Sequence, residues 1–510
     1  MGNLKKISNT VCIVALFASS PEFVFSSGNS EFAFSDDDEM TQNEKVLNSL
    51  EADINAIPYT ARDFFTEDDA FVDDNSSDNF NTNSGTYRVR ALNRFPNTPR
   101  ETSTEKWWHG NHATGTWFGV RSDLEGRGVD INGQYTFAYL ANVDGGVARG
   151  GAFDDQLQLG IDTNFGKLFK SSALIDTQFT FDFIHTYGPD DSANYVGNIF
   201  TVSQAYVDQG MYLDEMYLLQ GIHDREYWFK VGRLDAGNDF LVSDLYCVFV
   251  NSGFCGNPSA ITYNSPWSTP PNAQWGVLVG ASPIDEFVAK LGVYNTNLNT
   301  FEPNDIGGQF SFSNSQGANI MASISYLRNQ GDDDTGLSGR YTLGGIYFTG
   351  RQNNDDFTAD PNGAPGNRLG GLYFEIEQEL FAESGSSSGQ GLSSFLTSQV
   401  YNGWDVTMMP LFFNAGLVYT GIFDARPDDQ LALGGIYGRF GQDAIEYQGA
   451  GFGYEAVIEL TYRFNFTNWF FLQPDIQYVI HPFGGSAELA GTDTTPRNAF
   501  VIGLQGGFNL

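Results

Sequence analysis

Carboxylates, amides and aromatic rings recur at every second position in several segments of the chain, so each set would lie on one face of an extended strand. Such groups bind polar molecules, because carboxylates and amides form hydrogen bonds while aromatic rings stack on apolar surfaces. The candidate residues that share a face are Glu215 and Tyr217; Trp228 and Lys230; Tyr373, Glu375 and Glu377; Glu455, Glu459 and Arg463; and Gln473 and Asp475. The alternative for each position is a side chain that only contacts water.

Arg426 is a further candidate, at the start of the run Arg-Pro-Asp-Asp. Its guanidinium can pair with Asp428 or Asp429, because arginine and carboxylate form parallel hydrogen bonds. An ion-paired turn at the end of a strand is the alternative to a binding role for this residue.

The histidines do not form a catalytic or metal-binding group in the sequence. A barrel hydrolase would need a nucleophile such as Ser or Asp beside a base, usually His. His185 lies on the apolar face or at the end of its segment, His481 precedes a proline, and His109, His112 and His223 fall in expected turns. Two cysteines and scattered histidines also lack the ligand number of a metal site. The sequence therefore predicts no enzyme, no metal and no cofactor.

The chain begins with the features of a secretory signal peptide. Lys5 and Lys6 precede the apolar stretch from Val11 to Ala18, and small residues follow it. We expect residues 1–28 to be this signal peptide, with cleavage between Ser20 and Gly28. No other apolar run reaches the about 18 residues that a membrane-spanning helix needs. If the protein lies in a membrane, it must therefore cross it with strands.

Cys247 and Cys255 remain after removal of the signal peptide, which contains Cys12. In an exported protein this short spacing favours a disulfide over two free thiols. The pair lies in a long proline-containing segment between Gly237 and Gly276. Such long loops are usually functional or disordered, and a disulfide favours order. If the protein forms a pore, this loop is long enough to fold into it and narrow it.

Apolar and polar residues alternate from Trp107 onward, which indicates strands. In one segment the apolar face holds Phe464, Leu460 and Ile458, and the other face holds Arg463 and Glu459. Several runs reach about nine to twelve residues, the length of a tilted membrane-spanning strand, whereas strands of soluble proteins are typically about 5–6 residues long. Residues 107–510 provide about 25 residues for each strand and its loop in a sixteen-stranded pore. We therefore predict an all-β domain at 106–510, a transmembrane antiparallel β-barrel of about 16 strands.

The composition is strongly acidic. The 510 residues include 62 Asp and Glu and 26 Lys and Arg, for a formal net charge of −36, and no basic cluster suits nucleic acid. Residues 29–105, which precede the expected barrel, are rich in Asp and Glu. This composition predicts a largely disordered periplasmic extension. The mean hydropathy of −0.27 is that of a soluble protein, but alternation in a membrane barrel gives the same average.

Several ordered motifs resemble the carbohydrate-selective porins of the OprB family. They are TGTWFGVRSDLEGRGVDINGQY from Thr114, GNIFTVSQ from Gly197, YLDEMYLLQ from Tyr212, FKVGRLDAGNDF from Phe229, LYFEIEQELF from Leu372, TGIFDARPDDQLALG from Thr420, and EAVIELTYRFNFTNWFFLQPDIQYVIHPFG from Glu455. The sequence departs from the family pattern at Tyr212 and Tyr217, where Arg and Trp are frequent. It also places Phe508 before Leu510, where a terminal aromatic residue is usual.

This resemblance implies an outer-membrane barrel of a Gram-negative-type bacterium, monomeric or homotrimeric, which admits glucose-like sugars by passive diffusion. Its partners would be membrane lipid and small carbohydrates. Sugars present hydroxyl groups and flat C–H faces, and the carboxylates, amides and rings of the candidate residues suit both.

Three other classes of protein are alternatives to a sugar-permeable porin. A general, non-selective or cation-preferring porin has the same barrel, and the sequence distinguishes the barrel better than its selectivity. An outer-membrane barrel enzyme is a remote alternative because no catalytic group emerges. A secreted β-sandwich lectin would not have strands of this length.

Overall fold

The computed structural model describes residues 107–510 apart from 206–208, 224, 256–259, 266, 298–314, 331–335, 351–368, 384–389, 406 and 447–448. For Asn297, Ser315, Gln316 and Asp443 only the backbone is described. The expected signal peptide (1–28) and acidic extension (29–105) lie outside the described residues.

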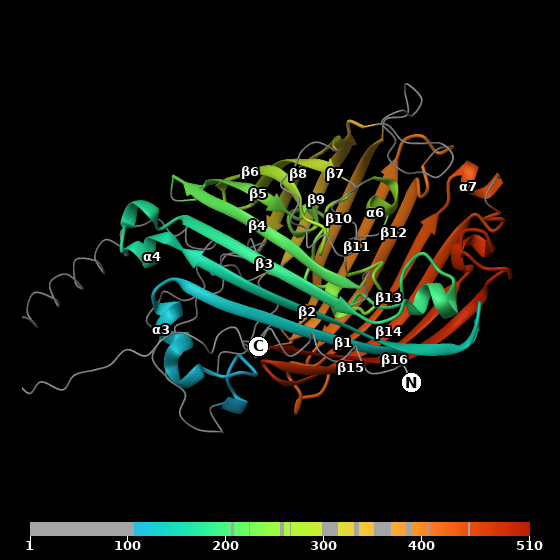
Figure 1. Cartoon of the computed structure of the whole chain (residues 1–510), viewed down its shortest axis with the longest axis horizontal. Coiled ribbons are helices and arrows are strands. Elements are labelled where there is room, and N and C mark those ends of the chain that lie inside the picture. The colour runs from blue at the N-terminus through green and yellow to red at the C-terminus, as the bar shows by residue number, and fades with distance from the viewer. Residues whose placement is uncertain are drawn as a thin grey trace, which may run out of the picture. The chain divides into compact units, whose positions relative to one another are not determined.

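Sixteen antiparallel strands close into one barrel, which confirms the predicted fold (Figure 1). Each strand pairs with its neighbours in the sequence, and β1 pairs with β16 to complete the ring. The strands are β1 (Val129–Gly146), β2 (Gly150–Asn164), β3 (Thr177–Tyr187), β4 (Gly210–Ile222), β5 (Tyr227–Leu234), β6 (Gln274–Ile284), β7 (Phe287–Asn297), β8 (Ser315–Arg328), β9 (Gly339–Phe348), β10 (Gly370–Ala382), β11 (Gly391–Tyr401), β12 (Leu411–Thr420), β13 (Gln430–Arg439), β14 (Tyr454–Thr467), β15 (Phe470–Ile480) and β16 (Arg497–Asn509).

The helices are short and lie in the connections between strands or before β1. They are η3 (Trp117–Gly119), α3 (Val120–Gly126), α4 (Phe165–Phe169), η4 (Ser172–Leu174), η5 (Ser192–Val196), α5 (Ala236–Asp239), η6 (Tyr246–Val248), α6 (Ala260–Asn264), α7 (Gln442–Glu446) and η8 (Pro482–Gly485). Among the described residues, no helix has both the length and the hydrophobicity to cross a bilayer.

The two faces of each strand differ in the way that the alternation predicts. On β14, Ile458, Leu460 and Phe464 are exposed on the outside of the barrel, while Glu455 and Glu459 are fully buried on the inside. A side-chain period of two puts every second residue on the same face, so the outer surface is apolar and the interior is polar.

The connections at the two ends of the barrel differ in length. At the end where β1 begins and β16 stops, most turns are short, such as 223–226, 285–286 and 468–469. The opposite end carries long connections, including 188–209, 235–273 and 481–496. We call these the turn end and the loop end. In outer-membrane barrels the short turns face the periplasm.

A segment before β1 covers the seam between the first and last strands at the turn end. The final pairs of β16 place Asn509 opposite Gln134, so the start of β1 extends beyond its partner. Residues 107–128, which we call the seam segment, fold back over this region. Arg121 donates two hydrogen bonds of 3.0 Å to the main-chain oxygen of Leu510, and its guanidinium lies 4.3 Å from the Trp117 ring centroid. An exposed strand edge is thereby tied down.

Replacing Arg121 should loosen this seam. Arg121→Met removes hydrogen bonds from a buried charged donor, each worth about 1.5–3 kcal/mol, so the midpoint of guanidinium unfolding in detergent should fall. Arg127→Met changes an exposed residue beside the same helix and should leave the midpoint unchanged. Equal midpoints for the Arg121 variant and the unmodified protein would contradict the assignment.

Candidate functional site

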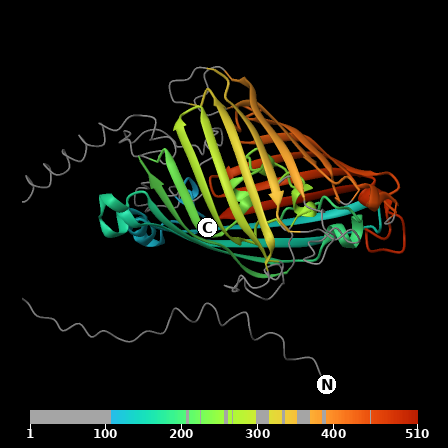
Figure 2. The ribbon, with the colours of Figure 1, turned by 90° about the horizontal axis from the view of Figure 1, so that it is seen from above.

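Two loops from the loop end fold into the barrel. Residues 188–209 connect β3 to β4 and form loop A, and residues 235–273 connect β5 to β6 and form loop B. Loop B reaches inward-facing side chains on strands from β9 to β15. Figures 1 and 2 show this part of the chain, which includes α6, between the walls of the barrel. Folded chain therefore occupies part of the barrel interior.

Glu459 on β14 holds the middle of loop B against the wall. Its two carboxylate oxygens accept hydrogen bonds from the main-chain N–H groups of Val250 at 2.6 Å and Asn251 at 3.1 Å. On the next strand Gln473 donates to the Val248 carbonyl at 2.6 Å, and Gln477 accepts from the Asn251 amide at 2.9 Å. These wall side chains take the place of a neighbouring strand for the loop backbone.

Glu455 holds loop A in the same way. Its carboxylate accepts main-chain hydrogen bonds from Ile199 and Phe200 at 3.0 Å, and from Phe483 at 2.7 Å. Phe483 belongs to the connection between β15 and β16. One buried carboxylate thus joins two different loops to the wall.

Glu375 and Glu377 on β10 meet a third part of loop B. The Tyr246 hydroxyl donates to Glu375 at 2.9 Å and is 2.6 Å from the Thr397 hydroxyl. Burial, followed by the charges of Glu375 and Glu377, raises the pKa of Tyr246 well above its ordinary value, so the hydroxyl stays protonated. Arg340 bridges Glu377 and the Val242 carbonyl.

The root of loop B is held by β4, β5 and β7. Glu215 accepts from the Asp235 main-chain N–H at 3.0 Å and from the Asn238 amide at 3.1 Å. The Lys230 ammonium lies 2.7 Å from an Asp239 carboxylate oxygen and 4.8 Å from the Tyr217 ring centroid. Lys290 also donates to the Asp239 carbonyl, at 2.9 Å.

Aromatic packing fixes loop B between these polar contacts. The rings of Phe249 and Phe254 stack at 4.2 Å, and both lie against Phe395 on β11. Gly434 on β13 faces them, and a Cβ there would lie 2.8 Å from each of these two rings. Such an approach is too close for any side chain, so this glycine makes room for the loop.

Cys247 and Cys255 are joined by a disulfide in the structure. The bond closes the part of loop B that contains Phe249, Val250, Asn251 and Phe254. This is the part that Glu459 and the phenylalanine cluster hold.

The loops cover most of the predicted binding residues. Ten of the candidates are buried in the described structure: Glu215, Tyr217, Trp228, Lys230, Tyr373, Glu375, Glu455, Glu459, Gln473 and Asp475. Trp228 and Tyr373 pack over Gly280 and Gly344 of neighbouring strands. The side chains of these candidates face the barrel interior, and several of them hydrogen-bond to loop B.

Arg463 and Glu377 are the inward-facing candidates that keep partial exposure. The Arg463 guanidinium stacks over the Phe471 ring at 3.7 Å and donates from Nε to Asn465 at 3.3 Å. Half-exposed polar residues on β1 and β2, including Gln134, Gln156 and Gln158, line the same interior. They provide hydrogen-bond donors and acceptors that water can reach.

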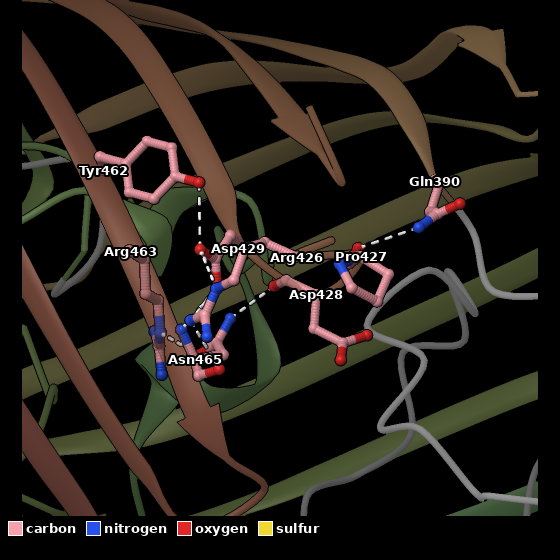
Figure 3. Close-up of polar contacts among 8 residues, drawn as sticks. All are labelled: Gln390, Arg426, Pro427, Asp428, Asp429, Tyr462, Arg463 and Asn465. Atoms are coloured by element: carbon pink, nitrogen blue, oxygen red, sulfur yellow. Dashed lines mark hydrogen bonds and ion pairs between the residues drawn. The ribbon is translucent and has the colours of Figure 1, made fainter. Parts of the chain in front are cut away.

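Arg426 lies in the turn between β12 and β13, at the turn end (Figure 3). It pairs with Asp429 through two hydrogen bonds of 2.8 and 2.7 Å, and it donates to the Asn465 carbonyl at 3.0 Å. Asp429 also accepts from the Tyr462 hydroxyl and from the Asn465 N–H, each at 3.0 Å. The Arg426–Asp429 pair therefore joins the turn to β14. This arrangement is the ion-paired turn that is the alternative to a binding role for Arg426.

Several residues that hold loop B are not among the candidates that the sequence suggests. Tyr246, Asp239 and Arg340 hold loop B, and the Asn251 amide donates to the Phe200 carbonyl of loop A and to Gln477 on β15. Tyr246 directly precedes Cys247, and Asn251 lies between Cys247 and Cys255. Their position at a cysteine pair in a long loop is the sequence signal that could have identified them. Arg340 carries no such signal because its neighbours in the sequence are glycine and tyrosine.

A closed sixteen-stranded barrel with loops pinned inside it defines a porin. Residues 148–510 match the family model described as "Carbohydrate-selective porin, OprB family", and the chain belongs to this family. It is 27% identical over 425 residues to Porin B of Pseudomonas aeruginosa, an alignment that covers 77% of this chain and 89% of the relative. The high-pH structure of Pseudomonas putida OprB has the same fold, with a TM-score of 0.68 and 24% identity, and covers 79% of this chain and 99% of that one.

Removing the Glu459 carboxylate should release loop B. Glu459→Ala leaves two buried N–H groups without acceptors, at a cost of about 1–3 kcal/mol each, so the loop should move and the single-channel conductance and its noise should rise. Gln158→Ala removes a polar interior side chain on β2 and serves as the control. If both variants change conductance equally, Glu459 is not a loop anchor.

Proposed function

We propose that this protein is an outer-membrane porin that admits small, glucose-like carbohydrates by passive diffusion. The main support is that inward-facing carboxylates hold loop B across the barrel, which leaves a restricted polar passage. Membership of a carbohydrate-selective family gives the class of solute. Partners of the protein are then membrane lipid and small sugars.

Arg463 and Glu377 are the residues that we assign to sugar contact. Both face the interior, and both retain exposure where the other candidates are covered. Stacking on Phe471 holds the Arg463 guanidinium flat, so its free edge can donate hydrogen bonds to hydroxyl groups. The buried candidates act indirectly, because they set the position of the loops that form the passage.

The same proposal assigns a role to each segment of the chain. Residues 1–28 direct export, residues 29–105 form an acidic periplasmic extension, and residues 106–510 form the pore. The turn end, from which the barrel chain starts, then faces the periplasm.

Selective passage can be tested by liposome swelling. Glucose should enter faster than a charged solute of equal size, and larger oligosaccharides should enter slowly, because the passage is narrow and lined by hydrogen-bonding groups. Arg463→Ala should reduce the preference for glucose, whereas Arg426→Ala, at the turn end, should not. Equal rates for all small solutes would contradict selective passage and would indicate a general porin.

A cation-preferring pore is the second candidate, and the charge distribution supports it. Residues 107–510 contain 44 acidic and 17 basic residues. A negatively charged passage attracts cations and repels anions. Reversal potentials in planar bilayers under a salt gradient should therefore show preference for potassium over chloride, most strongly at low ionic strength. A preference for chloride would contradict this assignment.

A further inference from the structure

Exposed apolar residues gather outside the barrel at the turn end. In the seam segment Trp108, Phe118 and Val120 are exposed, and on α4 Leu168 and Phe169 are exposed. The two sites adjoin, because Asn164 donates to the Gly128 carbonyl at 2.8 Å and a Cβ on Gly128 would lie 2.6 Å from the Lys167 Cβ. Figure 1 shows α3 and α4 at the same end of the barrel.

Phe118 is the extreme case, with a relative exposure of 103%. The backbone directs it outward: Trp117 and Phe118 both have positive φ angles, 51° and 60°. Such angles are unfavourable for residues with a side chain, and they persist only where surrounding contacts enforce them. The contact of Arg121 with Trp117 supplies this constraint. The fold thus holds the Phe118 side chain out of contact with the part of the chain that the structure describes.

A series of ring contacts connects the seam segment with the apolar outer surface of the barrel. Trp107 and Trp108 both contact Trp469, at 4.8 and 5.7 Å. Trp469 contacts Phe508 and Phe470, and Phe470 contacts Phe466, which is exposed on the outer face of β14. The patch is therefore continuous with the surface that meets hydrocarbon if the barrel lies in a membrane.

Positive charges border the patch. Lys170 follows Phe169, and Arg127 follows the last residue of α3, and both are exposed. Tryptophan and phenylalanine beside lysine and arginine are typical of a protein surface at the boundary between lipid headgroups and acyl chains. The long aliphatic stems can cover apolar surface while their charges reach phosphate.

We propose that the seam segment and α4 form a membrane-binding patch that inserts Phe118, Trp108 and Phe169 into the periplasmic leaflet. The occupant is a phospholipid surface, and the contact anchors the turn end beside the first strand. This proposal rests on the membrane location proposed above. The patch would hold the start of β1, next to the seam between β1 and β16, at a fixed depth in the membrane.

Spin labels in the full-length protein test this assignment. The background variant is Cys12→Ser, because Cys247 and Cys255 are joined to each other. Single cysteines replace Phe118 or Phe169, with Leu460 on the outer face of β14 as the lipid reference and Thr494 in the β15–β16 connection as the water reference. The proteins are reconstituted in vesicles of phosphatidylethanolamine and phosphatidylglycerol, and collision rates with oxygen and with a water-soluble nickel chelate are measured.

The labels at 118 and 169 should show a several-fold higher ratio of oxygen to nickel collisions than the label at 494, close to the ratio at 460. A ratio equal to that at 494 would mean that the patch faces water and would overturn the proposal. Low rates with both reagents would mean that protein covers the patch, from this chain or a second copy, and would also overturn it. A water-like ratio at 460 would instead contradict the membrane location itself.

Discussion

The structure depends on one requirement: backbone N–H and C=O groups that enter the barrel must find partners away from water. Loop B has no strand beside it inside the barrel. Glu459 supplies two acceptors to Val250 and Asn251, and Gln473 supplies a donor to Val248. Because the wall provides these groups at fixed positions along its strands, it also fixes the path of the loop inside the barrel.

Carboxylates suit this task for a geometric reason. Two oxygens on one side chain can accept from consecutive N–H groups, as Glu455 does for Ile199 and Phe200. Their burial is costly unless hydrogen bonds or opposite charges compensate. On β14 the compensation comes from backbone donors, while at the loop root Lys230 pairs with Asp239. The acidic character of the interior therefore contributes to architecture as well as to any selection of solutes.

The sequence predicts well which side chains face the barrel interior. It predicts poorly which of these side chains the loops cover. A period of two is sufficient to place Glu459 and Arg463 on the interior and Leu460 and Phe464 outside. The same pattern cannot distinguish Glu459, which loop B covers, from Arg463, which it leaves partly exposed. That difference depends on the path of a distant loop, a tertiary effect without periodicity. Arg426 shows the same limit, because its run of charges is compatible with a pore or a turn.

The wall and the loop are matched in shape as well as in hydrogen bonding. Gly416 and Gly434 leave space for Phe249, and Gly438 leaves space for Phe200 and Met409. Gly416 lies on β12, while Gly434 and Gly438 lie on β13, the strand that pairs with the β14 strand of Glu455 and Glu459. A side chain at Gly434 would push the phenylalanine cluster inward, and the carboxylate at Glu459 would then no longer meet its two N–H groups. The glycines and the carboxylate thus act on the same part of loop B, so a change in either would alter the path of the loop.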